Sequence, residues 1–233
     1  METRRRGAPE IDPERPEAAT EGGAAGRLQL LDWKERVFAL YQSVRASRDP
    51  AAAWAAWCAA REGLFRNHSQ SPVPEAERAR YTGSYFAYDP GARVLADVVD
   101  VPPACLLVAA SDGGTYRFIR FAEARFHLFR VPCSLALYWL EGYGGGLFLP
   151  FRDRTSGAQT YGAGRYLLDT VKGADLGFEN GRLVLDFNFA YNPSCAYDPR
   201  WSCPLAPPDN RLAVAVPAGE RIPAISLEEA TDA

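Results

Sequence analysis

The amino-acid sequence predicts a mainly β protein: an antiparallel β-barrel or β-sandwich preceded by two N-terminal α-helices. Three features lead to this fold class. Between about residues 30 and 66, apolar side chains recur at helical spacing in two successive stretches. From residue 81 onward, short segments rich in β-forming residues follow one another without helices between them. Hairpin-type turns such as Asp112-Gly113-Gly114 and Asn180-Gly181 separate some of these segments.

The composition is that of an ordinary globular domain. The 233 residues are 47% hydrophobic and 24% charged, so a core can form without disulfides or metals. A net charge of −3 provides no basic field for nucleic acid, and no stretch reaches the ~20 apolar residues of a membrane span. Because no signal peptide follows Arg4-Arg5-Arg6, we expect a soluble, cytoplasmic protein with reduced thiols.

One domain is expected over residues 27–226. Residues 1–26 are rich in Glu, Arg, Pro, Gly and Ala and lack periodicity, so they are predicted to form a disordered tail. Residues 227–233 are expected to be a flexible C-terminus.

Both helices have recognisable start signals. Asp32 and Glu35 have the spacing of a capping box, so the first helix is expected to begin near Asp32. Asp49 and Pro50 suit the N-cap and first turn of the second helix, and Gly63 is expected to help end it. The predicted apolar face of the first helix comprises Trp33, Val37, Phe38, Tyr41 and Val44.

Ten segments have the composition and length of strands. They are Ser84–Tyr88, Arg93–Val99, Cys105–Ala109, Thr115–Phe121, Arg125–Val131, Leu135–Glu141, Leu147–Phe151, Gly164–Asp169, Arg182–Ala190 and Leu212–Val216. The clearest alternation lies in residues 183–189, where Leu183, Leu185, Phe187 and Phe189 are expected to share one face. Asp186 and Asn188 then share the opposite face, toward solvent or a polar cavity.

Residues 191–210 form an unusual stretch, because their five prolines exclude a helix or a central strand. Irregular segments beyond ~12–15 residues are usually functional or disordered in compact domains. Tyr191, Tyr197 and Trp201 are residue types that tend to be buried. We therefore favour an ordered functional loop over a structural strap.

Cys195 and Cys203 in this loop have three interpretations. A structural zinc site needs two further ligands, and neither His68 nor His127 is spaced as a partner. A nucleophilic cysteine needs a base, a role that His68 fills only if the fold brings it close; otherwise His68 makes hydrogen bonds within its own loop. Two buried thiols, or a disulfide in an oxidising compartment, are the default.

A second polar cluster runs from Phe151 to Tyr166. Arg152, Arg154 and Arg165 could grip a carboxylate or phosphate in bidentate fashion. The alternative is a surface network of Arg and Asp bordering a β-turn at Thr155-Ser156-Gly157. The residue types alone leave both alternatives open.

Four stretches also carry a family resemblance. They are Trp57 with Arg61, Phe65 and residues 68–72; residues 85–90; residues 149–157 with 160–167; and residues 186–193 with Cys195, Tyr197, Cys203 and Asn210. In these stretches the sequence resembles the domain of unknown function 1684 family. The resemblance covers about residues 54–222 and implies a shared fold and a shared site, without a known reaction. The family usually has proline where this sequence has Ser69.

We expect a small-molecule site where the segment 161–165 meets the segment 188–203. Arg165 would hold an anionic group, Asp186 and Asn188 would orient it, and tyrosines would form the walls. The candidate ligand-binding residues are Arg152, Tyr161, Arg165, Asp186, Asn188, Tyr191, Asn192, Cys195, Tyr197, Cys203 and His68.

The alternative is a non-catalytic structural or adaptor protein whose polar motifs are hydrogen-bond struts. No H-E-x-x-H, G-x-S-x-G or paired C-x-x-C motif occurs in the sequence. The sequence therefore identifies no reaction, cofactor or oligomeric state, and it predicts no metal site.

Overall fold

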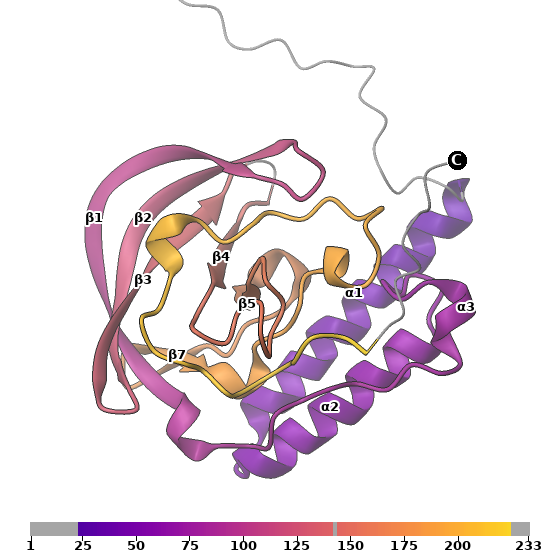
Figure 1. Ribbon diagram of the computed structural model, residues 1–233, viewed down its shortest axis with the longest axis horizontal. Coiled ribbons are helices and arrows are strands. Elements are labelled where there is room, and N and C mark those ends of the chain that lie inside the picture. Colours follow the sequence, from indigo (N-terminus) through magenta and orange to yellow (C-terminus); the bar gives the residue numbers. More distant parts are fainter. Residues whose placement is uncertain (1–22, 142–143, 225–233) are drawn as a thin grey trace, which may run out of the picture.

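The computed structural model describes residues 23–141 and 144–224, and it confirms a mainly β fold behind two N-terminal helices. The helices are α1 (Gly23–Ala46) and α2 (Pro50–Asn67), with a short α3 (Glu75–Arg78) after them. They lie side by side next to a strongly curved sheet, and the chain after residue 190 runs across the hollow of that sheet (Figure 1).

The second helix begins as predicted, because the Asp49 carboxylate accepts hydrogen bonds from the backbone N–H groups of Ala51 and Ala52 at 3.1 and 3.0 Å. The expected role of Gly63 in ending the helix is wrong, although the helix does end close to residue 66, the expected limit of the helical segment. The helix continues to Asn67, where the His68 N–H still donates to the Leu64 carbonyl at 3.0 Å.

The first helix begins at Gly23, so the capping box at Asp32 and the disordered state of residues 23–26 are wrong predictions. Asp32 lies within the helix, where its carboxylate accepts from Arg36 Nε at 2.8 Å and lies 2.9 Å from His68 Nε2. A side chain held by these partners is not available to cap a helix end. The remaining predicted tail, residues 1–22, and the C-terminus 227–233 lie outside the described residues.

Seven antiparallel strands form one sheet in the order β5-β4-β3-β2-β1-β7-β6. The strands are β1 (Arg93–Ala109), β2 (Thr115–Leu128), β3 (Val131–Leu140), β4 (Gly146–Phe151), β5 (Arg165–Asp169), β6 (Phe178–Glu179) and β7 (Arg182–Asp186). Two pairs of predicted strands merge into β1 and β2. Irregularities of register between Asp100 and Ala104, and between Arg120 and Ala122, absorb the apparent breaks, including Pro102 and Pro103.

The sheet is not closed into a barrel, so the barrel alternative of the fold prediction is wrong. One antiparallel bridge joins β5 to the chain beyond β7, with Tyr166 and Tyr191 exchanging backbone hydrogen bonds of 2.8 and 3.0 Å. Two other predicted strands are not strands. Within residues 84–88 only Tyr85 forms a bridge, to Glu220, and residues 212–216 form an extended segment without a ladder.

The alternation predicted for residues 183–189 stops at Asp186, because the chain turns there into a 3-10 helix, Phe187–Phe189. The Asp186 carboxylate starts this turn by accepting from the Asn188 N–H at 3.0 Å. As a result, Phe187 enters one hydrophobic cluster and Phe189 a different one. Asp186 and Asn188 do not face solvent, as both are buried.

Two main hydrophobic clusters hold the fold together. One lies inside the curved sheet, where Leu135, Leu149 and Leu185 pack with Leu212 and Val216 of the C-terminal segment. The other joins the sheet to the helices, with Tyr41 and Trp57 packing against aromatic side chains of β4, β5 and the segment after β7. The C-terminal segment therefore completes the inner core without joining the sheet.

Asn210 attaches this segment to two strands. Its side-chain oxygen accepts from the Ala136 N–H at 2.8 Å, and its amide nitrogen donates to the carbonyls of Ala136 and Pro150 at 3.0 and 2.7 Å. The side chain is completely buried, so water cannot replace these bonds.

Replacing Asn210 with alanine is expected to lower the free energy of unfolding by about 2–5 kcal/mol, because it leaves buried backbone groups of β3 and β4 without partners. Urea unfolding followed by tryptophan fluorescence measures this change. The neighbouring exposed Asp209 provides the control, since Asp209→Ala is expected to change stability by less than about 0.5 kcal/mol. Equal effects of the two substitutions would contradict the role assigned to Asn210.

Candidate functional site

A buried ion pair joins helix α2 to the C-terminal segment. Arg61 Nε lies 2.5 Å from Glu220 Oε1, and Nη2 lies 3.3 Å from Oε2. The Arg61 guanidinium also lies over the rings of Phe65 and Tyr191, at 4.4 and 4.9 Å from their centroids. Burial disfavours its charge, but the Glu220 carboxylate outweighs this and raises the pKa of Arg61.

Glu220 is 2% exposed and gathers further donors. Its Oε2 accepts from the Asn192 N–H at 2.6 Å and from the Tyr197 hydroxyl at 3.0 Å. Two predicted site residues, Asn192 and Tyr197, therefore meet at a carboxylate that the sequence analysis missed. The sequence shows only a glycine before Glu220, and the structure gives its reason: Gly219 has φ +77°, and a Cβ there would lie 2.5 Å from the Ala190 carbonyl oxygen.

A small cavity of about 60 Å³ lies beside this ion pair, and we call it the Tyr41–Asn192 cavity. Helices α1 and α2, strand β5 and the segment after β7 contribute to it. It is lined by Trp33, Val37, Tyr41, Arg61, Phe65, Pro72, Tyr166, Lys172, Ala174, Tyr191, Asn192, Pro193 and Ser194.

Two buried polar atoms of the cavity lining lack hydrogen-bond partners: Tyr41 Oη and Asn192 Oδ1. The Asn192 amide nitrogen donates to the Arg221 carbonyl at 2.8 Å, which fixes Oδ1 as the unpaired acceptor. The Trp57 indole lies close enough to favour the Tyr41 phenolate weakly, without forming a hydrogen bond of normal geometry. Burial nevertheless raises the pKa of Tyr41, so its hydroxyl stays protonated and can donate.

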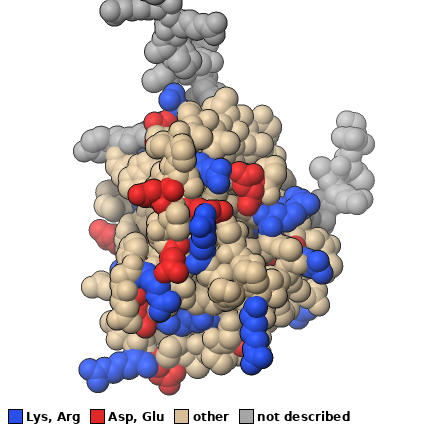
Figure 2. All heavy atoms as spheres, turned by 90° about the vertical axis from the view of Figure 1, so that its left-hand side faces the viewer, with Lys and Arg blue, Asp and Glu red and all other residues tan. Residues whose placement is uncertain are grey.

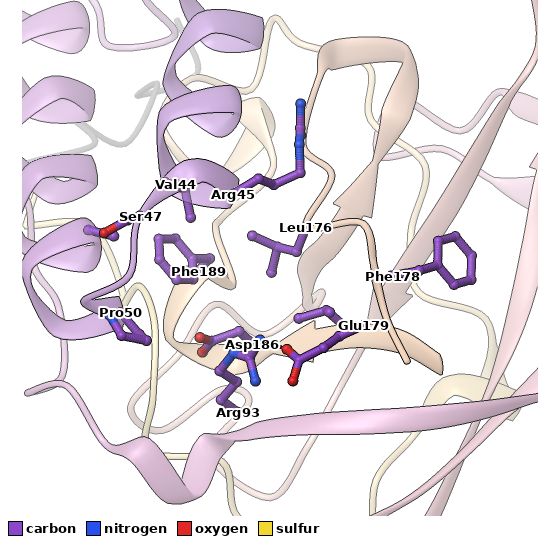
Figure 3. Close-up of a pocket in the computed structure, with 12 residues that line it drawn as sticks. Val44, Arg45, Ser47, Pro50, Arg93, Leu176, Phe178, Glu179, Asp186 and Phe189 are labelled. Atoms are coloured by element: carbon purple, nitrogen blue, oxygen red, sulfur yellow. Dashed lines mark hydrogen bonds and ion pairs between the residues drawn. The ribbon is translucent and has the colours of Figure 1, made fainter. Parts of the chain in front are cut away.

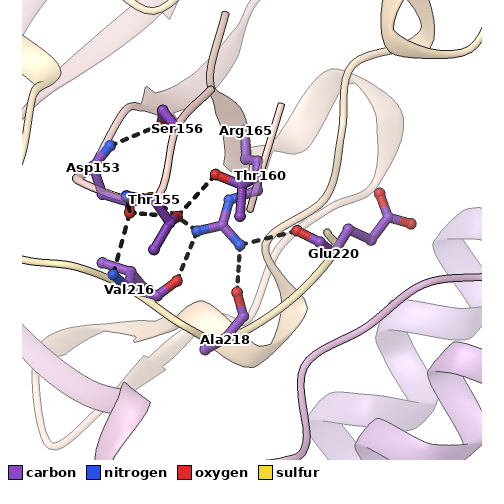
Figure 4. Close-up of polar contacts among 8 residues, drawn as sticks. All are labelled: Asp153, Thr155, Ser156, Thr160, Arg165, Val216, Ala218 and Glu220. Atoms are coloured by element: carbon purple, nitrogen blue, oxygen red, sulfur yellow. Dashed lines mark hydrogen bonds and ion pairs between the residues drawn. The ribbon is translucent and has the colours of Figure 1, made fainter. Parts of the chain in front are cut away.

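Arg165 lies in a separate buried network (Figure 4), in which both terminal nitrogens of its guanidinium have partners and its Nε has none. Its Nη2 donates to Asp153 Oδ2 at 2.9 Å and to the Val216 carbonyl at 3.0 Å. Its Nη1 donates to the carbonyls of Glu220, at 3.1 Å, and Ala218. The side chain is 1% exposed, so the guanidinium predicted to hold an anionic ligand is occupied by the protein itself.

Asp186 and Asn188 form another closed network. The Asn188 amide nitrogen donates to the Asp89 carbonyl and to Asp186 Oδ1, both at 2.8 Å, while its oxygen accepts from the Asp89 N–H at 2.9 Å. Burial raises the pKa of Asp186, and the hydrogen bonds from Asn188 partly offset this. Asn188 thus ties the turn at Asp89 to the end of β7.

A larger pocket of about 300 Å³ lies at the ends of α1 and α2, with Asp186 in its wall. Figure 3 shows Phe189 and Leu176 within it and the charged side chains of Arg93 and Glu179 near β7. Arg93 pairs with Glu179 at 2.7 Å, and Arg45 donates to the Asp175 carbonyl at 2.5 Å. Its charged lining groups therefore already have partners.

Tyr161, Cys195 and Cys203 come together in a third group. The Tyr161 hydroxyl donates to Cys195 Sγ at 3.8 Å, and the Cys195 N–H donates to Cys203 Sγ at 3.3 Å. His68 is elsewhere: Gln70 N–H donates to its Nδ1 at 3.0 Å, so Nε2 carries the proton toward Asp32. His68 is thus not a base for Cys195.

The predicted single site therefore resolves into several. Asn192, Tyr191 and Tyr197 gather around Arg61 and Glu220, whereas Arg165, the pair of Asp186 and Asn188, the cysteines and His68 belong to separate groups. Arg152 is half-buried, and its backbone pairs with Asn210 and Leu212. The segments 161–165 and 188–203 do meet, but through Tyr161 and Cys195 rather than around Arg165.

The described residues contain no group of three or more His, Cys, Asp or Glu side chains placed to hold a metal ion. None of the helices in residues 23–141 and 144–224 is long and apolar enough to cross a membrane. Acidic and basic side chains are intermingled on the face shown in Figure 2, so neither sign of charge dominates that face.

Comparison with known proteins agrees with the resemblance expected from the sequence. Residues 80–221 match the family described as protein of unknown function (DUF1684), a narrower range than the expected 54–222. The solution NMR structure of an uncharacterized protein of Haloarcula marismortui is 36% identical, with a TM-score of 0.54, over 76% of this chain and 95% of that chain. No curated protein matches the sequence. The chain belongs to the DUF1684 family.

Proposed function

We propose that the protein binds a small polar molecule in the Tyr41–Asn192 cavity. The observation that carries this proposal is the pair of buried polar atoms without partners, Tyr41 Oη and Asn192 Oδ1, in the wall of one cavity. An unpaired buried polar group costs about 1–3 kcal/mol. A molecule that pairs with both atoms recovers this cost on binding.

Tyr41 Oη and Asn192 Oδ1 require complementary groups on the ligand. Asn192 Oδ1 accepts, so the ligand presents an N–H or O–H group, and the protonated Tyr41 hydroxyl donates to an acceptor. A primary amide provides both functions, and so does a hydroxyl group next to a carboxylate, whereas a carboxylate alone presents only acceptors. Lys172 also lines the cavity, and its ammonium lies 3.6 Å from Asp169 Oδ2. A ligand that carries a carboxylate would therefore have a cation in the cavity wall.

The shape of the cavity restricts the ligand further. A volume of about 60 Å³ accommodates only a few non-hydrogen atoms, so the ligand is small or inserts only one end. Trp33 and Phe65 stack at 5.9 Å between ring centroids, and Tyr191 provides a further aromatic side chain in the cavity wall. Flat, weakly polar groups suit such walls.

The remaining predicted site residues support the cavity rather than the ligand. Arg165 and Asp153 hold the C-terminal segment that carries Glu220, and Glu220 positions the backbone of Asn192. Arg165 and Asp153 thus act as hydrogen-bond struts, whereas Tyr41 and Asn192 are the residues proposed to contact the ligand.

Tyr41→Phe separates a ligand contact from a structural role. We expect the free protein to become about 1 kcal/mol more stable, because an unpaired buried hydroxyl is removed, while affinity for the ligand falls about tenfold. The probes are glycolate and acetamide, which each present a donor and an acceptor, tested by ligand-detected NMR and by thermal unfolding.

Tyr138→Phe is the matched control. Its hydroxyl is also buried without a partner, but Tyr138 does not line the cavity. It is expected to change stability in the same direction and leave probe binding unchanged. If none of the probes binds, or both variants bind them as tightly as the native protein, the proposal is wrong.

Arg165→Leu tests the division between support and binding. Removing the guanidinium leaves the buried Asp153 carboxylate uncompensated and three carbonyls without donors, so we expect a loss of about 3–5 kcal/mol in unfolding free energy. Chemical denaturation measures the loss. Arg154→Leu, at an exposed position whose side chain lies outside the network, is expected to have little effect.

Probe binding to the folded fraction of Arg165→Leu, measured at low temperature, is expected to match the native protein. A stable Arg165→Leu protein that has lost probe binding would instead place the ligand at Arg165.

A further inference from the structure

We propose that Cys195 and Cys203 form a redox-active pair in which Cys195 reacts with a hydroperoxide and Cys203 then closes an intramolecular disulfide. This inference is independent of the Tyr41–Asn192 cavity and its ligand. It rests on the way three separate parts of the chain surround the Cys195 sulfur.

The Cys195 sulfur lies next to a hydroxyl donor and to the second cysteine. The Tyr161 hydroxyl, from the segment before β5, donates to Cys195 Sγ at 3.8 Å, and Cys203 Sγ lies 3.3 Å from the Cys195 backbone nitrogen. Such donors stabilise a thiolate over a thiol. The Cys203 thiol, followed by Ser111 and Tyr161, lowers the pKa of Cys195 to about 6, against the opposing effect of burial.

Cys203 has the opposite character. Its sulfur accepts from the Cys195 N–H at 3.3 Å, which places it beside the Cys195 backbone. The neighbouring Cys195 and burial together raise the pKa of Cys203, so it remains a protonated thiol. One thiolate next to one thiol is the arrangement in which a first cysteine attacks an oxidant and a second resolves the product.

The two cysteines are held by different anchors. The Cys203 N–H donates to Ser111 Oγ at 3.0 Å, and its carbonyl accepts from the Ser111 N–H at 2.9 Å, so the turn between β1 and β2 fixes it. Cys195 lies in the 3-10 helix Ser194–Ala196. The proline-rich loop between them is thereby folded back so that its two thiols meet.

Access limits the oxidant to small molecules. Cys195 is 8% exposed and Cys203 4%, which admits a hydroperoxide more readily than a protein disulfide. Two further titratable groups face the pair, Tyr166 from β5 and Lys172. The positive charge of Lys172 lowers the pKa of Cys203, but Cys195 and burial raise it by more.

The proposed reaction has two steps, oxidation of Cys195 and closure of the disulfide. The Cys195 thiolate attacks the terminal peroxide oxygen, an S–O bond forms, the O–O bond breaks, and the departing oxygen takes up a proton to leave an alcohol or water. The Cys203 sulfur then attacks the Cys195 sulfur; an S–S bond forms, the S–O bond breaks, and the hydroxide leaves with the Cys203 proton as water. The thiol pair loses two electrons, and the hydroperoxide gains them.

The test uses the full chain with Cys58→Ala, Cys105→Ser and Cys133→Ser, which leaves only the pair. One equivalent of hydrogen peroxide is expected to remove both free thiols and about 2 Da of mass, and to link the peptides containing Cys195 and Cys203. The rate should rise with pH around a midpoint of about 6. Tyr161→Phe should move that midpoint upward, because it removes one donor to the thiolate.

Two single variants distinguish the roles. In Cys203→Ser, dimedone is expected to trap a sulfenic acid on Cys195; in Cys195→Ser, Cys203 is expected to stay reduced. In the native protein, Cys195 is expected to oxidise before the exposed Cys105. Persistence of Cys195 as a free thiol after Cys105 has reacted, or a sulfenic acid on Cys203 instead, would overturn the proposal.

Discussion

The ion pair between Arg61 and Glu220 is the interaction on which the arrangement of this protein depends. It connects helix α2 to the C-terminal segment across the hollow of the sheet, and Glu220 in turn holds Asn192 and Tyr197. Removing one partner of a buried pair typically costs about 3–5 kcal/mol, because the other charge stays in the interior. Beside the hydrophobic cluster that packs the helices on the segment after β7, this carboxylate is the polar contact that ties the two together.

Buried polar side chains elsewhere work in the same manner, by attaching irregular chain to regular elements. Asn210 pairs with two strands, Asn188 with the turn at Asp89, and Arg165 with three carbonyls of the C-terminal segment. This segment has no ladder of its own, so side chains satisfy those of its backbone groups that isolated backbone hydrogen bonds leave unpaired. An open sheet thereby gains a filled interior without closing into a barrel.

The sequence predicted those features that depend on local chemistry. Asp49 capped the second helix as expected, the β-rich segments lie in strands or beside them, and the loop 191–210 is ordered. Features that depend on distant partners were missed. Asp32 had the spacing of a cap, but Arg36 and His68 occupy its carboxylate. Arg165 resembled an anion-binding residue because three of its four acceptors are backbone carbonyls, which no residue type marks, and the fourth is the Asp153 carboxylate.

The ion pair also bears on how the chain is made. Arg61 and Glu220 are separated by 159 residues, so a ribosome that has released the N-terminal helices must still add most of the chain before the counter-charge exists. Until then the guanidinium stays hydrated, and the aromatic surface around it stays partly open. The helices consequently cannot complete this contact until Glu220 has been synthesised, so the docking of the first elements of this domain depends on a residue made long after them.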